Sequence, residues 1–141
     1  MDVNAIVENF RRIVTTQYFD FEGRTRRQVF WYYVLAYIVI YILVSFVESI
    51  FFGGGMMPYG YGFYRPQPLT GLLTLALLLP GLGIGARRLH DIDRSAWWLL
   101  IGIIPFVGWL LLIYWYAQPG TVGSNQFGPD PKDAIAAPTP A

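Results

Sequence analysis

The densest group of residues that could do chemistry is the stretch GARRLHDIDRSAWW, residues 85–98. It holds three arginines, two aspartates and the chain's single histidine, between two strongly apolar segments. Guanidinium forks match phosphate oxygens, and basic residues beside a membrane attract anionic lipid headgroups. A second basic group precedes the first apolar segment. We therefore expect one cationic cluster that binds an anionic lipid headgroup or another anionic ligand. Its members are Arg24, Arg26, Arg27, Arg87, Arg88, His90, Asp91 and Arg94.

The same residues also suit a purely structural role. The arginines would hold a short turn on the cytoplasmic side and form ion pairs with nearby carboxylates, namely Asp20, Glu22, Asp91 and Asp93. Arg87 and Arg88 would in addition complement the dipole at the end of a helix. Sequence alone leaves both readings open.

Metal binding and catalysis find little support in this stretch. His90, Asp91 and Asp93 offer one nitrogen and two carboxylates, and nothing nearby completes a zinc coordination shell. Together with His90 and Asp91, Ser95 completes the residue types of a catalytic triad, but a triad is defined by spatial geometry that this spacing does not show. The chain has no phosphate-cradling Gly-rich loop with lysine and no metalloprotease motif. We expect no metal, no cofactor and no enzymatic activity.

The composition places the chain in a membrane. Of its 141 residues, 55% are hydrophobic and 13% are charged, whereas about 25% of a soluble domain is charged. The net charge of +1 argues against nucleic-acid binding, which usually needs a basic domain. The chain has no cysteine, which excludes disulfides, thiolate metal sites and cysteine nucleophiles.

Three apolar segments predict an all-α membrane protein with three transmembrane helices, over about residues 29–52, 69–86 and 96–116. In the second, closely spaced glycines after Pro80 would allow another helix to approach closely, or would instead loosen the last turns of the helix. Aromatic residues mark both ends of the third segment, as expected for two membrane interfaces about 30 Å apart. Residues 29–131 thus form the predicted transmembrane domain. The Gly/Pro/Tyr-rich stretch 53–68 is predicted to be an external loop, and residues 132–141 a disordered tail.

Residues 1–28 are predicted to form a cytoplasmic amphipathic helix followed by a basic turn. Apolar residues recur there at three- and four-residue spacing, on one face of a helix. That face could lie in the membrane interface or pack on the protein's own helices, and both alternatives remain open.

Orientation follows from the arginines, because cytoplasmic loops collect Lys and Arg. With three spans, residues 1–28 and the 87–94 turn share a side that holds eight basic residues. The other side holds Arg65 and Lys132. We predict a cytoplasmic N-terminus and a periplasmic C-terminus, in the bacterial inner membrane.

Three stretches closely resemble, in order, the signature stretches of the domain of unknown function 805 family, small bacterial inner-membrane proteins. They are DFEGRTRRQVFW (20–31), ARRLHDIDRSAWW (86–98) and PGTVGSNQFGPDP (119–131). The chain departs from the family pattern at Ala96, where the family usually has glycine, and at Asp93, where it often has glycine. The stretch 53–68 resembles an insertion. The resemblance implies a multi-pass inner-membrane location and no established activity. Within the three stretches the family pattern carries over onto Gly23, Arg24, Arg27, Phe30 and Trp31; onto Arg87, Arg88, Leu89, His90, Asp91, Ser95, Trp97 and Trp98; and onto Pro119, Gly120, Gly123, Asn125, Phe127, Gly128 and Pro131.

These observations predict a non-enzymatic membrane component whose cationic cytoplasmic face binds a partner protein or anionic phospholipid headgroups. A homo-oligomer is compatible with this reading, and nucleic acid is not an expected partner. The alternative is a subunit of an oligomeric transporter or channel. Glu48, near the outer end of the first span, is the residue that would support transport, although it can also reach water or pair with Arg65.

Overall fold

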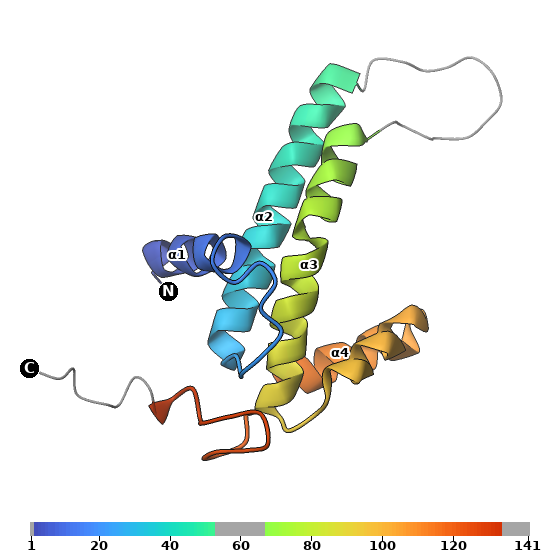
Figure 1. Cartoon of the computed structure of the whole chain (residues 1–141). Coiled ribbons are helices and arrows are strands. Elements are labelled where there is room, and N and C mark those ends of the chain that lie inside the picture. The colour runs from blue at the N-terminus through green and yellow to red at the C-terminus, as the bar shows by residue number, and fades with distance from the viewer. Residues whose placement is uncertain (1, 53–66, 134–141) are drawn as a thin grey trace, which may run out of the picture.

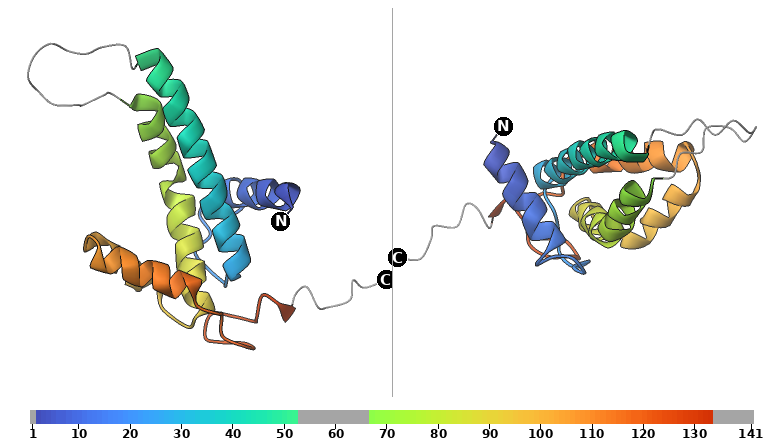
Figure 2. Two further views of the ribbon diagram at one scale, coloured as in Figure 1. Left: turned by 180° about the vertical axis from the view of Figure 1, so that it is seen from behind. Right: turned by 90° about the horizontal axis from the view of Figure 1, so that it is seen from above.

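The computed structural model describes residues 2–52 and 67–133. Two long antiparallel helices lie side by side, α2 (Arg27–Phe52) and α3 (Pro68–Asp91) (Figure 1). The short helix α1 (Val3–Val14) crosses one side of this pair. On the other side, the 3₁₀ helix η1 (Ala96–Ile103) and helix α4 (Val107–Ala117) form a hairpin (Figures 1 and 2). Residues 53–66 and 134–141, which include most of the predicted loop and tail, lie outside the described part.

Helices α2 and α3 are each long and apolar enough to cross a bilayer. At about 1.5 Å per residue, their 26 and 24 residues extend roughly 39 and 36 Å, against a hydrocarbon core of about 30 Å. The upper half of α2 turns large apolar side chains outward, and Ile42, Phe46 and Ile50 are each about 60% exposed. Such a surface is stable in lipid and not in water. The first two predicted spans therefore coincide with these helices.

Glycines in the lower half of α3 let other segments approach its backbone. A Cβ at Gly83 would lie 2.9 Å from the carbonyl oxygen of Asp20, and one at Gly85 would lie 3.0 Å from the hydroxyl of Tyr116. Both distances are shorter than real Cβ atoms tolerate comfortably. The predicted close packing is confirmed at both glycines, but a helix is the partner only at Gly85, through Tyr116 of α4, whereas loop backbone is the partner at Gly83.

Glu48 has a structural partner at the far end of the helix pair. Its carboxylate accepts hydrogen bonds from the backbone N–H of Leu69 (2.6 Å), the backbone N–H of Thr70 (3.2 Å) and the Thr70 hydroxyl (2.5 Å). Gln67, at the N-cap position of α3, makes no side-chain cap. The carboxylate of one helix thus satisfies the free N–H groups at the start of the other, where the helix dipole also favours negative charge.

The third predicted span is not confirmed. Residues 96–116 do not form one helix, because the chain breaks at 104–106, where Phe106 has a φ of +62°. η1 and α4 then run back alongside each other, and the Trp109 indole N–H donates to the Gly102 carbonyl at 2.8 Å. At about 2.0 Å per residue for η1 and 1.5 Å for α4, each arm is only about 16 Å long. Neither arm alone reaches across a bilayer.

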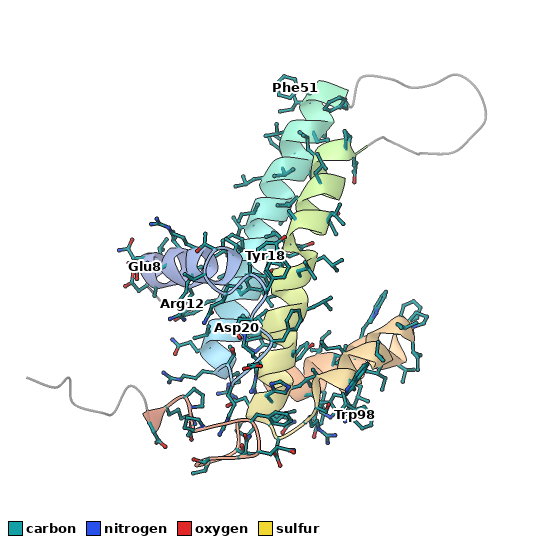
Figure 3. The ribbon with its side chains drawn as sticks, in the orientation of Figure 1. Glu8, Arg12, Tyr18, Asp20, Phe51 and Trp98 are labelled. Carbon is teal, nitrogen blue, oxygen red and sulfur yellow. The ribbon has the colours of Figure 1, made fainter. Side chains whose placement is uncertain are left out.

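The two aromatic groups of this segment consequently lie together. Trp98 from η1 and Trp115 from α4 are in edge-to-face contact, with ring centroids 5.2 Å apart. The expectation that they mark opposite membrane interfaces is wrong, because the chain reverses between them. Figure 3 shows Trp98 on this hairpin and Phe51 at the distant end of α2.

The predicted separation of the N- and C-terminal segments is also wrong for residues 118–133. The Thr121 backbone N–H donates to the Asp91 carbonyl at 2.8 Å, and Arg24 donates to the carbonyls of Thr121 and Gly123. Residues 118–133 therefore lie at the same end of the helix pair as residues 20–27. The returning hairpin is the physical reason, since η1 and α4 bring the chain back to the end of the helix pair from which it left.

Helix α1 packs on the protein's own helices, which is one of the two alternatives left open for it. Phe10 stacks on Tyr33 with centroids 5.6 Å apart, and Ile13 is fully buried against α2 and α3. Val3 and Val7, on the first half of the helix, are 68% and 58% exposed. The C-terminal half packs on the protein, and the N-terminal half keeps an apolar stripe free. A cluster of Ile13, Phe30, Tyr33 and Ile84 forms the core beneath it.

Candidate functional site

The basic stretches meet at the end of the helix pair where α2 begins and α3 ends, called here the base. Arg88, on the last turn of α3, is completely buried. Its Nη1 donates to Asp91 Oδ2 at 2.6 Å, one turn along the same helix, and its Nε donates to the Tyr116 carbonyl at 3.1 Å. Its Nη2 donates to the Gln118 carbonyl. Arg88 thus joins the end of α3 to the end of α4.

Arg24 enters the base from the turn between α1 and α2. Gly23, with a φ of +76°, reverses the chain just before it. Arg24 Nε donates to Asp91 Oδ1 at 3.1 Å, while its Nη1 and Nη2 donate to the carbonyls of Gly123 and Thr121, both at 2.6 Å. One guanidinium therefore connects three segments that are far apart in sequence.

The segment 119–131 closes over the base. Asn125 donates to the His90 carbonyl at 2.8 Å, and the ring of Phe127 stacks flat on His90 with centroids 4.0 Å apart. His90 Nδ1 lies 3.0 Å from the Gly23 carbonyl. A Cβ at Gly120 would collide with the Asp91 carboxylate, so only glycine fits where the tail passes this residue.

Asp130 fixes the end of this segment. Its carboxylate accepts the backbone N–H of Lys132 at 2.9 Å and that of Gly123 at 3.2 Å. The hydrogen bond from Lys132 is the largest influence on the pKa of Asp130. Together with the hydrogen bond from Gly123 and the charges of Arg24 and Lys132, it outweighs burial and lowers this pKa below its ordinary value of 3.8.

The structure divides the predicted cluster into two groups. Arg24, Arg88 and Asp91 have side chains only 1%, 0% and 5% exposed, and their polar atoms are engaged by one another and by backbone carbonyls. We call these three residues the base network. It holds the fold together, which is the structural alternative that the sequence left open. Among the described residues, no group of His, Cys, Asp or Glu is placed to hold a metal ion.

Arg27 and Arg94 also have partners. Arg27 Nη1 donates to the Ala117 carbonyl at 3.3 Å. The Arg94 guanidinium lies over the ring of Trp115, 4.4 Å from its centroid, and 5.9 Å from that of Trp98. Both arginines therefore support the hairpin, and Arg27 also lines a small pocket with Arg26 and Asp91 on the side of the closing segment.

A pocket of about 270 Å³ collects the other arginines, between α1, the start of α2 and the end of α3. We call it the arginine pocket. Its polar lining comes from Arg12, Gln17, Arg24, Thr25, Arg26 and Arg87, and its apolar lining comes from Ile13, Val29, Ile84 and Pro131. The sequence did not place Arg12 or Gln17 in the site. The available signal was the amphipathic pattern of α1, because burying the apolar face of a helix also fixes the direction of its polar side chains.

Arg87 is held far less firmly than Arg88. Its Nε donates to the Gly83 carbonyl and its Nη1 to Asp20 Oδ2, both at 3.4 Å. Its Nη2 is buried and has no hydrogen-bond partner in the described part of the chain. Figure 3 shows Asp20 in the segment after α1, and Arg12 on α1 itself.

The three stretches that build the base are also those that relate the chain to known proteins. The family model described as "Protein of unknown function (DUF805)" matches residues 18–129. The chain belongs to the DUF805 family. It is 40% identical over 119 residues to the inner membrane protein YhaH of Escherichia coli K12, covering 84% of this chain and 93% of YhaH. It is 38% identical to the inner membrane protein YhaI of the same strain, covering 84% and 92%. No solved structure matches the chain.

The DUF805 match divides the site in an informative way. It includes Arg24, Arg88, Asp91 and the segment that closes over them, so the whole base network lies within the family domain. Helix α1 precedes residue 18, and the match therefore leaves out Arg12 and Gln17. In this helical membrane protein of the DUF805 family, the arginine pocket forms where the family domain meets α1.

Proposed function

We propose that this chain is a non-enzymatic component of the bacterial inner membrane whose cationic cytoplasmic base binds anionic phospholipid headgroups. Its membrane part would consist of α2 and α3 as crossing helices, with η1 and α4 as a re-entrant hairpin. YhaH and YhaI, each of which aligns with 84% of this chain, are named inner membrane proteins, and this supports the inner-membrane location.

The distribution of basic residues supports the orientation. Of the ten Lys and Arg residues, Arg65 is the one that lies between α2 and α3 in the sequence. The other nine belong to α1, the segment before α2, the end of α3 and the residues that follow it. Lys132, which the three-span reading placed outside, joins this side because the hairpin returns. The positive-inside rule then puts the base, the N-terminus and residues 118–133 in the cytoplasm.

The exposed apolar surface of the hairpin supports its insertion into lipid. Ile103, Phe106 and Val107, around its tip, are 79%, 74% and 67% exposed. Backbone at membrane depth has to be satisfied internally, and the two packed helical arms with the Trp109 hydrogen bond largely meet that need. The Trp98–Trp115 pair lies at the open end, near the base, where aromatic rings suit the interface.

The observation that carries the lipid proposal is the presence of cations without carboxylate partners beside an exposed apolar stripe. In the described part of the chain, Arg12 and Arg26 form no salt bridge. Val3 and Val7 of the same short helix are exposed and can dip into the headgroup region, although they lie on another side of α1 than Arg12. A charged, partly apolar surface at the level of the headgroups fits an anionic bilayer.

The transporter alternative is not the one that the geometry favours. Glu48, the ionisable residue that would support an ion path, is buried and occupied in capping α3. The polar groups of the base network are likewise occupied.

The test is lipid selectivity of the purified protein. Native mass spectrometry of protein extracted from the membrane should show phosphatidylglycerol or cardiolipin retained in preference to phosphatidylethanolamine. Raising the salt concentration during purification should reduce retention, because exposed charges are screened. Equal retention of zwitterionic and anionic lipids would contradict the proposal. Specific ion or solute flux in proteoliposomes would favour the transporter alternative.

A further inference from the structure

We propose that the arginine pocket is a discrete site for the phosphate group of one anionic phospholipid, with Arg12, Gln17, Arg26 and Arg87 as its binding residues. This inference deepens the proposal of a lipid-binding base and rests on it. A cationic surface attracts many lipids weakly, whereas a pocket holds one lipid in a fixed position.

The first argument is the unsatisfied guanidinium of Arg87. This residue is 4% exposed, and a buried N–H group without a partner is costly. Its Nη2 has none in the described residues, and its Nε and Nη1 reach protein oxygens only at 3.4 Å. Arg88, the next residue, donates from Nη1 to the Asp91 carboxylate at 2.6 Å. Arg87 is therefore the arginine of the pair with donors left for a ligand, and a phosphate supplies acceptors on several sides.

The second argument is the local balance of charge. Asp20 is the carboxylate that contacts Arg87, at 3.4 Å, and its own side chain is 40% exposed. In the base network, Asp91 pairs with both Arg24 and Arg88, and the charge of Asp130 also acts on Arg24, so the surplus positive charge at the pocket comes from Arg12, Arg26 and Arg87 against Asp20. Arg12 donates to the neutral side chain of Asn9 at 3.0 Å and, like Arg26, has no salt bridge among the described residues. An anion in the pocket would relieve the mutual repulsion of these cations.

The third argument is the mixed character of the pocket. Its volume of about 270 Å³ equals the share of roughly nine water molecules in the liquid, enough for a phosphate with a small substituent. Ile13, Val29 and Ile84 give it an apolar part. It lies between α1, whose exposed stripe marks the membrane interface, and the lower part of the crossing helices. Phosphate and apolar groups occur together in this way at the glycerol level of a phospholipid.

The experiment compares two neighbouring arginines of α1. Arg12 lines the pocket, whereas Arg11 is exposed, does not line it and forms no salt bridge in the described part of the chain. R12Q and R11Q change the net charge equally and remove the same side chain from the same helix. Delipidated full-length protein in neutral detergent is titrated with short-chain phosphatidylglycerol, and one-to-one complexes are quantified by native mass spectrometry. R87Q and R87K are measured in parallel.

The wild type is expected to bind one phosphatidylglycerol with saturable affinity. R12Q and R87Q should weaken this complex about tenfold or more, because each removes a charge-assisted hydrogen bond. R87K, which keeps the charge and loses the fork, should fall between them and the wild type. R11Q should change the affinity less than twofold. R12Q tests the site even if R87Q fails to fold, since Arg12 lies on an exposed face of α1.

Other outcomes overturn the inference in distinguishable ways. Equal losses in R11Q and R12Q would show a diffuse cationic surface, which keeps the lipid-binding base and removes the pocket. Displacement of phosphatidylglycerol by millimolar inorganic phosphate or glycerol 3-phosphate would assign the pocket to a soluble phosphate compound. Absence of any anionic preference in the wild type would remove both proposals.

Discussion

Replacing Asp91 by asparagine should cost this protein much of its stability. The carboxylate accepts from Arg24 Nε at 3.1 Å and from Arg88 Nη1 at 2.6 Å, and all three side chains are at most 5% exposed. Hydrogen bonds to charged groups contribute about 1.5–3 kcal/mol each, and breaking a buried ion pair costs about 3–5 kcal/mol. Asparagine keeps one acceptor oxygen but leaves two buried guanidiniums without a counter-charge. We expect a loss of about 3 kcal/mol.

The loss can be converted to a melting temperature. Unfolding entropy of about 2.1 cal/mol/K per residue gives roughly 0.3 kcal/mol/K for 141 residues, so Tm should fall by on the order of 10 °C. Thermal scans in detergent, followed by tryptophan fluorescence, measure this shift. The base carries Trp98 and Trp115 nearby, so the signal reports on the affected region.

Asp93 provides the matched control. It lies two residues further along, is exposed, and has a φ of +59°, a conformation that asparagine also adopts readily. D93N makes the same chemical change without removing a buried partner and should alter Tm by no more than 2 °C. If D91N is as stable as D93N, the base network does not hold the fold and the reasoning fails.

Four further predictions follow from other contacts. E48A should destabilise the protein by about 1 kcal/mol in the same thermal scan, because the cap of α3 is lost, while S49A on the neighbouring exposed position should not. G120A should lower the free energy of unfolding by about 1–3 kcal/mol, because its Cβ meets the Asp91 carboxylate. The control G71A, where a Cβ within a helix meets open space, should be neutral or slightly stabilising. A larger loss in G71A than in G120A would contradict the packing described. Single cysteines D2C and K132C should both be protected from labelling by an impermeant maleimide in intact spheroplasts and should react after permeabilisation. Labelling of K132C alone in intact spheroplasts would instead support an odd number of membrane crossings. Because the pKa of Asp130 is lower in the folded than in the unfolded chain, its contribution to stability is complete above about pH 4 and is lost as the pH falls through the lowered folded value. The protection of the Gly123 and Lys132 amides against hydrogen exchange, taken relative to their intrinsic rates, should then fall in the wild type and in D133N but not in D130N.

Apolar length and charge predicted the membrane helices well. The spans expected over 29–52 and 69–86 fall within α2 and α3, because a run of lipid-compatible residues leaves the backbone few alternatives to a helix. The reversal at 104–106 was not predictable in the same way. A proline such as Pro105 favours a bend in a helix, but bending and folding back differ in tertiary contacts, such as that between Trp109 and Gly102, that apolar composition does not encode.

Residue type alone could not separate the arginines of the site. Arg87 and Arg88 are adjacent on α3, yet Arg88 is enclosed by the ends of α3 and α4, while Arg87 faces α1 and Asp20. The helical turn of about 100° between neighbours separates their environments. Their different roles depend on where the tail and α1 pack, and those contacts come from segments nearly 30 residues or more away.

The base network and the arginine pocket depend on each other through the chain geometry. Arg24 is fixed by Asp91 and by carbonyls of the closing segment, and the Thr25 backbone N–H donates to the Arg87 carbonyl at 3.0 Å. Arg26, two residues after Arg24, is thereby held at the pocket opposite α1. The paired charges of the base network thus fix the position of the pocket arginines, which have unused hydrogen-bond donors. Such preorganisation lowers the entropic cost of binding an anion, since the cations do not have to be gathered by the ligand. The paired arginines of the base network are for this reason the ones that make a ligand site at the base physically reasonable.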